Sequence, residues 1–375
     1  MLKLKPELIK NLDTPEGLRN ALQQAIELEH STIPTYLYAY FSLRFAPGYS
    51  EAGTSTNYYI NEAIWTIVYE EMLHMGLACN LLNAIGGQPR INKRGFIPKY
   101  PGPLPGGVDK GLIVPLAPFS RELVHDVFME IEEPEQPIDP SVDAKSILAA
   151  KPGHITIGQF YHAIAVELKR QAKSIFVGRH DLQVDLSQTF SDENTRPTSA
   201  SGSDSKPGAD GLIPKAVTNI DSALAAINLI VDQGEGSSKS PLNPEGQKAH
   251  YYRFAEIYHG KQLIEDPANP GEWIYGGPPI YFDPSPSGVV PMIKNPKEAD
   301  YPANSEAQGY CRVFNETYKL LLDYLHDTFN GKPGRLNTAI ALMDSLYANA
   351  SSLMSIQLKD GLYAGPSFEY RAIER

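Results

Sequence analysis

The stretch that most constrains the fold is a helical pattern from Ile64 to Leu82, because it places two polar side chains inside an apolar stripe. Glu71 and His74 share a face with apolar residues at helical spacing: Ile64, Ile67, Val68, Met75, Ala78 and Leu82. Residues three apart on a helix lie within about 60° of each other, so one metal ion could contact both side chains. An unpaired buried carboxylate is costly, and the pattern therefore predicts partners for Glu71 on other helices.

A helix predicted over residues 13–43 supplies one such partner. Glu29 shares its face with apolar and aromatic residues: Leu22, Ala25, Ile26, Ile33, Tyr36 and Tyr40. Glu27 lies instead with polar residues: Asn20, Gln23 and Gln24. Glu29 is therefore predicted to be buried. Pro34 predicts a kink or bulge one turn after Glu29, because proline removes a backbone hydrogen bond.

Two later helical patterns add further candidates. Residues 155–176 carry Glu167, which has apolar residues on one side and polar residues on the other. Residues 247–264 carry Glu256 and His259, a second Glu-x-x-His pair with apolar neighbours on its face. This second pair is the predicted partner of the first.

Alternatives remain for the third and fourth helices. Glu235, after a helix predicted over residues 215–233, could replace Glu167, and His250 lies on the face opposite His259. The two remaining Glu-x-x-His pairs are interpreted as polar-face or capping groups: Glu27 with His30, and Glu122 with His125.

The predicted set combines four carboxylates and two imidazoles from four helices: Glu29, Glu71, His74, Glu167, Glu256 and His259. The ferritin-like dinuclear pattern takes one Glu from each of two helices and a Glu-x-x-His from each of two others. Oxygen and nitrogen ligands of this kind suit two iron ions, with manganese as the alternative. Four carboxylates would also neutralise two divalent ions.

The fold predicted from these patterns is all-α, a ferritin-like four-helix bundle. Residues 1–264 are predicted to form the metal-binding domain, with a long Gly/Pro-rich crossover over 88–153 that contains a short helix near 120–131. Residues 265–375 are predicted as a Pro/Gly-rich segment followed by a helical extension that packs on the bundle.

Charge and composition limit the classes of partner. The chain has 33 basic and 44 acidic residues and a formal net charge of -11, which argues against nucleic acid or an anionic membrane as partner. Two cysteines cannot form a disulfide framework. The start has no apolar signal region and no run reaches transmembrane length, so we expect a soluble, cytoplasmic protein, with a homo-oligomer possible.

Four stretches of the sequence resemble a known family: ALQQAIELEHSTIPTYLYAYFSL, EEMLHMGLACNLLNAIGG, TIGQFYHAI and HYYRFAEIYHG. They resemble the bacterial ferritin-like family grouped with the iminophenyl-pyruvate dimer synthase domain, a domain name that comes from large synthases of bis-indole pigment pathways. The resemblance implies a ferritin-like bundle with a C-terminal helical extension. It also implies that Glu29, Glu71 and His74 match the family's positions.

The functional hypothesis is an O₂-activating di-iron oxidase or oxygenase that acts on a small organic substrate, derived from an aromatic amino acid. Two alternatives belong to other classes of protein. Iron storage would require a shell-forming subunit, which the long extensions disfavour. A non-catalytic ferritin-like scaffold would keep the bundle and bind no stoichiometric metal.

Overall fold

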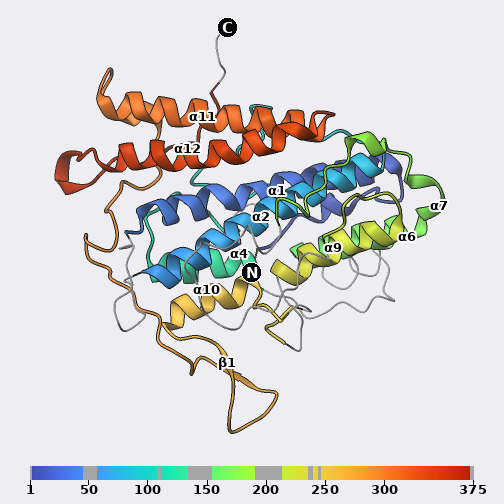
Figure 1. Cartoon of the computed structure of the whole chain (residues 1–375), viewed down its shortest axis with the longest axis horizontal. Helices are drawn as coiled ribbons and strands as arrows, with labels where there is room; N and C mark the ends of the chain where they lie inside the picture. Colours follow the sequence, from blue (N-terminus) through green and yellow to red (C-terminus); the bar gives the residue numbers. More distant parts are fainter. Residues whose placement is uncertain are drawn as a thin grey trace.

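The computed structural model describes residues 2–44, 57–107, 111–133, 154–190, 213–234, 240–243 and 246–371. Its helices form three layers (Figure 1). The central layer contains the two long helices α1 (Pro15–Ser42) and α2 (Tyr58–Ala84), which pack side by side. Thr14 caps α1 by accepting a hydrogen bond from the Gly17 amide, and Pro15 occupies its first position. Pro34 lies inside α1, which continues as an α-helix to Ser42.

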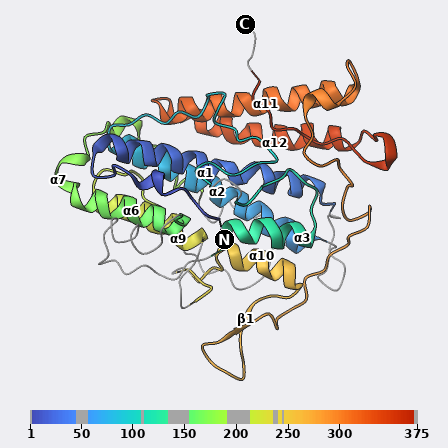
Figure 2. The same cartoon turned by 180° about the vertical axis from the view of Figure 1, so that it is seen from behind.

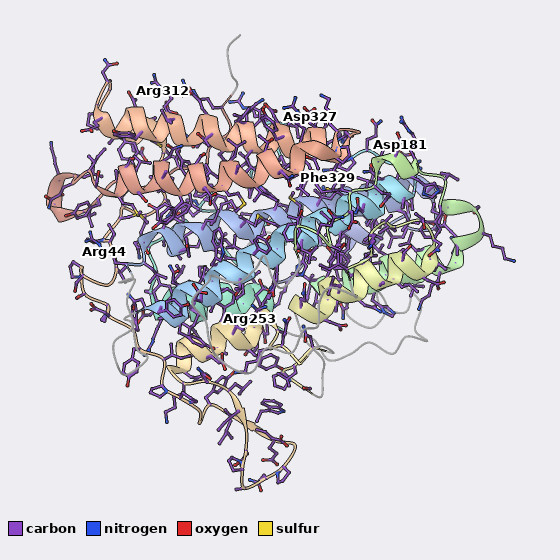
Figure 3. The ribbon with its side chains drawn as sticks, in the orientation of Figure 1. Arg44, Asp181, Arg253, Arg312, Asp327 and Phe329 are labelled. Carbon is purple, nitrogen blue, oxygen red and sulfur yellow. The ribbon has the colours of Figure 1, made fainter. Side chains whose placement is uncertain are left out.

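The second layer is a C-terminal pair of helices, α11 (Glu306–Phe329) and α12 (Leu336–Met354), joined through η6 (Pro333–Arg335). This pair covers one face of the central layer (Figure 1). Phe329, at the end of α11, is 1% exposed and packs toward Gly76 of α2 (Figure 3). The predicted helical extension that packs on the bundle is therefore present.

The third layer covers the opposite face of α1 and α2 with two short helix pairs (Figures 1 and 2). One pair is α6 (Ile157–Arg170) with α9 (Ile220–Gly234). The other is α10 (His250–His259) with a segment that changes from α3 (Arg121–Leu123) to the π-helical η2 (Val124–Met129) and then to α4 (Glu130–Glu132).

This third layer differs in detail from the two long helices predicted over 155–176 and 247–264. The first pattern is divided at Gln171 into α6 and the short α7 (Ala172–Ile175). The second ends at Gly260, whose backbone has a φ of 70°, a left-handed conformation that favours glycine at the end of a helix. The short helix predicted near 120–131 corresponds to the segment from α3 to α4. This segment packs against α10 and so belongs to the bundle rather than to a covering loop.

The connecting segments lie over the helices. The crossover after α2 is held to α1, since Tyr100 donates a hydrogen bond to the Ser31 carbonyl and Thr35 donates one to the Pro115 carbonyl. The strands β1 (Ile264–Glu265) and β2 (Trp273–Ile274) form an antiparallel hairpin. The remaining short turns are helical: η1 (Pro6–Ile9), η3 (His180–Leu182), η5 (Glu298–Asp300) and η7 (Lys359–Gly361). Among the described residues, no helix has the length and apolar character needed to cross a membrane.

Candidate metal centre

Three of the predicted residues meet between the central and third layers. Glu29 from α1, and Glu71 with His74 from α2, are 6%, 3% and 1% exposed. His74 Nδ1 lies 3.6 Å from Glu29 Oε2 and 3.8 Å from Glu71 Oε1. Metal–ligand bonds of about 2 Å place neighbouring ligand atoms roughly 3 to 4 Å apart. This first group therefore has the spacing that one metal ion requires.

A second group of the same kind adjoins the first. It consists of Glu71 again, Glu132 from α4 and His250 from the first turn of α10, all buried. His250 Nδ1 lies 3.0 Å from Glu71 Oε1 and 3.4 Å from Glu132 Oε2. The rings of His74 and His250 stack with their centroids 5.5 Å apart. Because Glu71 belongs to both groups, the arrangement suits two ions that share one carboxylate.

The outer nitrogen of each imidazole is held by an acceptor. His74 Nε2 lies 2.9 Å from Gln233 Oε1 of α9, and His250 Nε2 lies 2.8 Å from Glu70 Oε2. Each imidazole must carry a proton on Nε2 to donate this hydrogen bond. The hydrogen bond fixes the orientation of the ring, so that Nδ1 of both histidines faces the shared Glu71 carboxylate. Arg253 of α10 forms an ion pair with Glu70 and holds it in place; its position in the third layer is labelled in Figure 3.

Each carboxylate of the two groups also accepts a hydrogen bond from a hydroxyl group. Tyr161 of α6 donates to Glu29, and Tyr36 of α1 donates to Glu132 Oε1 at 2.6 Å. The Thr32 hydroxyl lies 2.9 Å from Glu71 Oε2. These hydroxyl groups orient the carboxylates before any ion is bound. Burial, and then the neighbouring carboxylates, raise the pKa of both tyrosines well above the usual value, so both keep their protons.

The electrostatics of the cluster favour a cation. Burial, followed by the charge of Glu132, raises the pKa of Glu71 to about 7. Burial alone would lower the pKa of His250, but the surrounding carboxylates, Glu132 first, outweigh it and raise that pKa well above its usual value. Three carboxylates in one buried space repel each other, and protons or metal ions would relieve the repulsion.

One buried atom tests whether the residues fit a metal ion. His250 Nδ1 is close to Glu71 Oε1, yet the two atoms do not have hydrogen-bond geometry, and Nδ1 has no hydrogen-bond partner among the described residues. A buried nitrogen of this kind is costly unless it binds something. Its direction, the oxygen and nitrogen donors, and the held Nε2 atoms all fit iron or manganese.

The family model described as Ferritin-like matches residues 22–259, more than half of the chain, and this range includes both groups. The chain belongs to the ferritin-like family. The predicted all-α, ferritin-like fold class is thereby confirmed, as is the predicted resemblance.

Two known proteins are similar to this ferritin-like chain over most of its length. Dichlorochromopyrrolate synthase of Lentzea aerocolonigenes is 22% identical over 410 residues, which cover 96% of this chain and 36% of the synthase. The chain thus spans about a third of the length of that relative. A ferritin-like protein of Caulobacter vibrioides, known from a crystal structure at 1.95 Å, has the same fold with a TM-score of 0.56 and 22% identity. The match covers 94% of this chain and 97% of that one.

Glu167 does not lie at the candidate centre. It sits on α6, where the Arg170 Nε donates a hydrogen bond of 2.6 Å to Glu167 Oε2. The face of α6 that meets the central layer presents Tyr161 instead, and Tyr161 reaches Glu29. Six residues of α-helix correspond to about 600° of rotation, so Glu167 points about 120° away from Tyr161.

Glu256 and His259 also lie away from the centre. The buried Glu256 carboxylate forms an ion pair with Lys248 and accepts hydrogen bonds from Tyr59 and the Leu263 amide. His259 is exposed and stacks on Tyr275, with ring centroids 4.1 Å apart. His250 and His259 are nine residues apart on α10, which corresponds to about 900° of rotation, so they point in opposite directions. His250 is the one that faces α2.

Three of the six predicted residues thus lie elsewhere, and two other residues, Glu132 and His250, join the three that meet. His250, an alternative in the sequence, occupies the position expected for His259, whereas Glu235 lies outside the described residues. Glu132 was missed. An apolar stripe of Val124, Val127, Phe128 and Ile131 could have indicated a buried helix there, but Glu130, Glu132 and Glu133 compete for the inward position, and the π-helical turn shifts which of them faces inward.

Proposed function

We propose that this ferritin-like protein binds two iron ions at the paired Glu and His groups and uses O₂ to oxidise a small organic substrate. The observation that supports the proposal best is the buried Glu71 carboxylate, which faces both His74 and His250. A carboxylate shared by two histidine-containing groups is what a dinuclear centre requires. Manganese is the other ion that these ligands would suit.

The chain's own residues would divide the work. Glu29 and His74 would hold one ion, Glu132 and His250 the other, and Glu71 would lie between them. When bound, the ions supply the redox chemistry that reduces O₂. Burial of all five side chains keeps bulk water out, which strengthens every charge interaction within the site.

The hydroxyl groups around the centre would act on the carboxylates rather than on the ions. Tyr36 and Tyr161 stay protonated, and their hydroxyl groups donate hydrogen bonds to Glu132 and Glu29. Each terminal carboxylate therefore keeps one oxygen bound to a hydroxyl group and one oxygen free for an ion. This division favours one-oxygen binding by the terminal glutamates.

The proposed substrate class is a small compound derived from an aromatic amino acid. Support comes from the resemblance to the iminophenyl-pyruvate dimer synthase domain and from the similarity to a protein named dichlorochromopyrrolate synthase. The activity of that longer protein belongs to the whole of it. We propose only the substrate class for this chain, and its conversion by oxidation.

The first experiment measures metal content and the optical spectrum of protein purified after growth with iron. We expect roughly two irons per chain with an oxo-bridge absorption. In Glu71→Ala, both groups lose their shared ligand, and we expect most of the metal and the absorption to disappear. Glu167→Gln is the matched control, because this carboxylate is bound to Arg170 on α6 and should not affect metal content.

Two results would contradict the proposal of a dinuclear oxidase. Wild-type protein that holds no metal, and whose thermal stability is unchanged when iron or manganese is added without oxygen, would support the scaffold hypothesis. Assembly of the chain into a closed shell, measured by light scattering, would support storage instead.

A further inference from the structure

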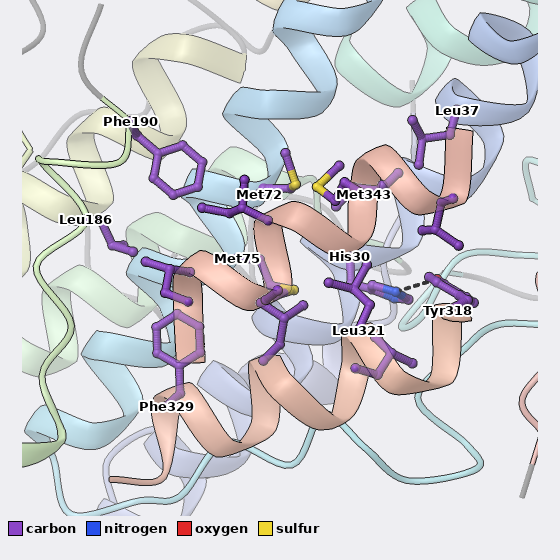
Figure 4. A pocket seen from close by; sticks show the side chains of 17 residues that line it. His30, Leu37, Met72, Met75, Leu186, Phe190, Tyr318, Leu321, Phe329 and Met343 are labelled. Carbon is purple, nitrogen blue, oxygen red and sulfur yellow. Dashed lines mark hydrogen bonds between the residues drawn. The ribbon is translucent and has the colours of Figure 1, made fainter. Parts of the chain in front are cut away.

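A cavity of about 50 Å³ lies between the central helices and the C-terminal pair (Figure 4). α1 and α2 contribute residues on one side of it, and α11 and α12 on the other. Three residues of its wall each directly follow a residue of the candidate centre: His30 follows Glu29, Met72 follows Glu71, and Met75 follows His74. Neighbouring residues of a helix point about 100° apart, so the cavity lies across the central layer from the candidate metal centre, roughly one helix diameter of about 10 Å away.

The wall is apolar. Its polar side chains are His30 and Tyr318, and these two are hydrogen-bonded to each other, with 2.6 Å between the hydroxyl and Nε2 (Figure 4). The other lining residues are Leu, Ile, Met, Phe and Ala. A water molecule needs two to four polar partners, whereas this wall offers a single buried side-chain atom without a hydrogen-bond partner in the described structure, His30 Nδ1.

The size of the cavity selects its occupant. About 50 Å³ exceeds the space that one water molecule needs, but it is roughly one third of the 150 Å³ of an apolar cavity that binds benzene. An indole or phenyl ring would therefore not fit. A nonpolar molecule of about two heavy atoms would fit, because it loses no hydrogen bonds on leaving water.

Access to the cavity is possible from its outer rim. Met72, Leu325, Ile340 and Met343 line it and are partly exposed. The two methionines are unbranched and change rotamer easily, so the rim can open for a small molecule without movement of a helix.

We propose that this cavity binds dioxygen and holds it on the far side of the central helices from the candidate metal centre. Binding of a small nonpolar gas follows from the wall and the volume alone, whereas its identity as O₂ rests on the proposed function. The cavity is distinct from the place where an aromatic substrate would bind.

The test uses xenon, a nonpolar probe that strongly scatters X-rays, in pressurised crystals of the full chain. Xenon is expected in the cavity of the wild type. Ala339 of α12 is fully buried and lines the cavity, so Ala339→Val places two additional methyl groups there and should reduce xenon occupancy at least tenfold. Ala348→Val, on the exposed face of the same helix, is the matched control with the same change in helix propensity and should keep xenon.

A second variant guards against misfolding of the first. Leu346→Ala removes three carbon atoms from the wall and should allow benzene to bind and to raise the Tm of the variant, but not that of the wild type. Ordered water in the wild-type cavity, absence of xenon there, or equal xenon occupancy in Ala339→Val would overturn the proposal.

The assignment to O₂ has its own readout. Iron-loaded, reduced protein is mixed with O₂ at several concentrations, and Ala339→Val should need at least threefold more O₂ for half-maximal oxidation, with an unchanged maximal rate. An unchanged O₂ dependence, with xenon binding lost, would overturn dioxygen as the occupant. Failure of the protein to bind iron would contradict the proposed function, and the xenon result would still be readable.

Discussion

Glu71 is shared between the two groups of the candidate centre, whereas Glu29 and Glu132 each belong to one. The three carboxylates are buried together, and burial with the charge of Glu132 raises the pKa of Glu71 to about 7. Removing a terminal carboxylate should therefore have a smaller effect on metal binding than removing the shared one.

Glu132→Gln tests this difference at a residue that the sequence pattern did not single out. We expect metal content to fall from roughly two ions per chain to roughly one, because His250 loses its own carboxylate while the group around His74 stays complete. Metal analysis after loading with iron measures this. Glu130→Gln, an exposed neighbour in α4, should retain both ions, and equal losses in the two variants would contradict the assignment.

The buried His30 should make the free energy of unfolding depend on pH. Burial lowers its folded-state pKa to about 3, against about 6.5 in the unfolded chain, so below pH 6.5 protons bind preferentially to the unfolded chain. Its contribution is complete above pH 6.5 and declines as pH falls toward 3. At pH 5 the wild type should have lost about 2 kcal/mol through this group.

Denaturant unfolding at pH 7 and pH 5 measures the contribution of His30. His30→Gln can still accept the hydrogen bond from Tyr318 and should lose about 2 kcal/mol less than the wild type over this range. His125→Gln, at an exposed histidine, should behave as the wild type does. Equal pH dependence in wild type and His30→Gln would show that His30 is protonated in the folded protein.

At the scale of elements, the phase of a short helix decides which carboxylate reaches the centre. The π-helical turn η2 contains about one residue more per turn than an α-helix would, and it lies directly before α4, which carries Glu132. Because each residue of an α-helix turns the chain by about 100°, this extra residue determines which of three nearby glutamates faces His250.

Deletion of Asp126 tests the role of η2. This residue is exposed, and its removal should convert the π-helical turn to an α-helical one and rotate Glu132 by about 100° away from His250. We expect metal content close to one ion per chain, with helix content by circular dichroism nearly unchanged. Asp126→Ala keeps the chain length and should bind two ions. Two ions in the deletion variant would show that Glu132 is not a ligand.

The boundaries of the long helices could be predicted well, and those of the third layer could not. Residues 13–43 correspond to α1, Pro15–Ser42, because Thr14 and Pro15 mark its start and an apolar pattern of 3.6 residues continues along it. α10 is ten residues long, too short for its periodicity to separate His250 from His259. Only its packing against η2 and α2 determines which histidine is buried.

At the scale of the molecule, the central helices are buried from both sides. The third layer covers the face with the candidate metal centre, and α11 and α12 cover the face with Ile33 and Leu37 (Figures 1 and 2). The segment before α11 is also attached, since Tyr38 donates a hydrogen bond to the Ile293 carbonyl at 2.5 Å. The C-terminal region therefore completes the core of the bundle.

A chain ending at residue 264 tests this conclusion. Its central helices would expose a continuous apolar face that includes Ile33, Leu37, Met72 and Met75, and we expect it to aggregate or to bind a hydrophobic dye. Size-exclusion chromatography and thermal unfolding of this fragment and the full chain make the comparison. A monomeric fragment with a cooperative transition would show instead that residues 1–264 fold independently.

The sequence by itself determined the helical class, the long central helices, and the burial of Glu29, Glu71 and His74, because each depends on periodicity within one helix. Only the tertiary structure decided that Glu132 and His250 complete the candidate centre. Their helices are short, so packing against distant segments, rather than local pattern, sets the direction of each side chain.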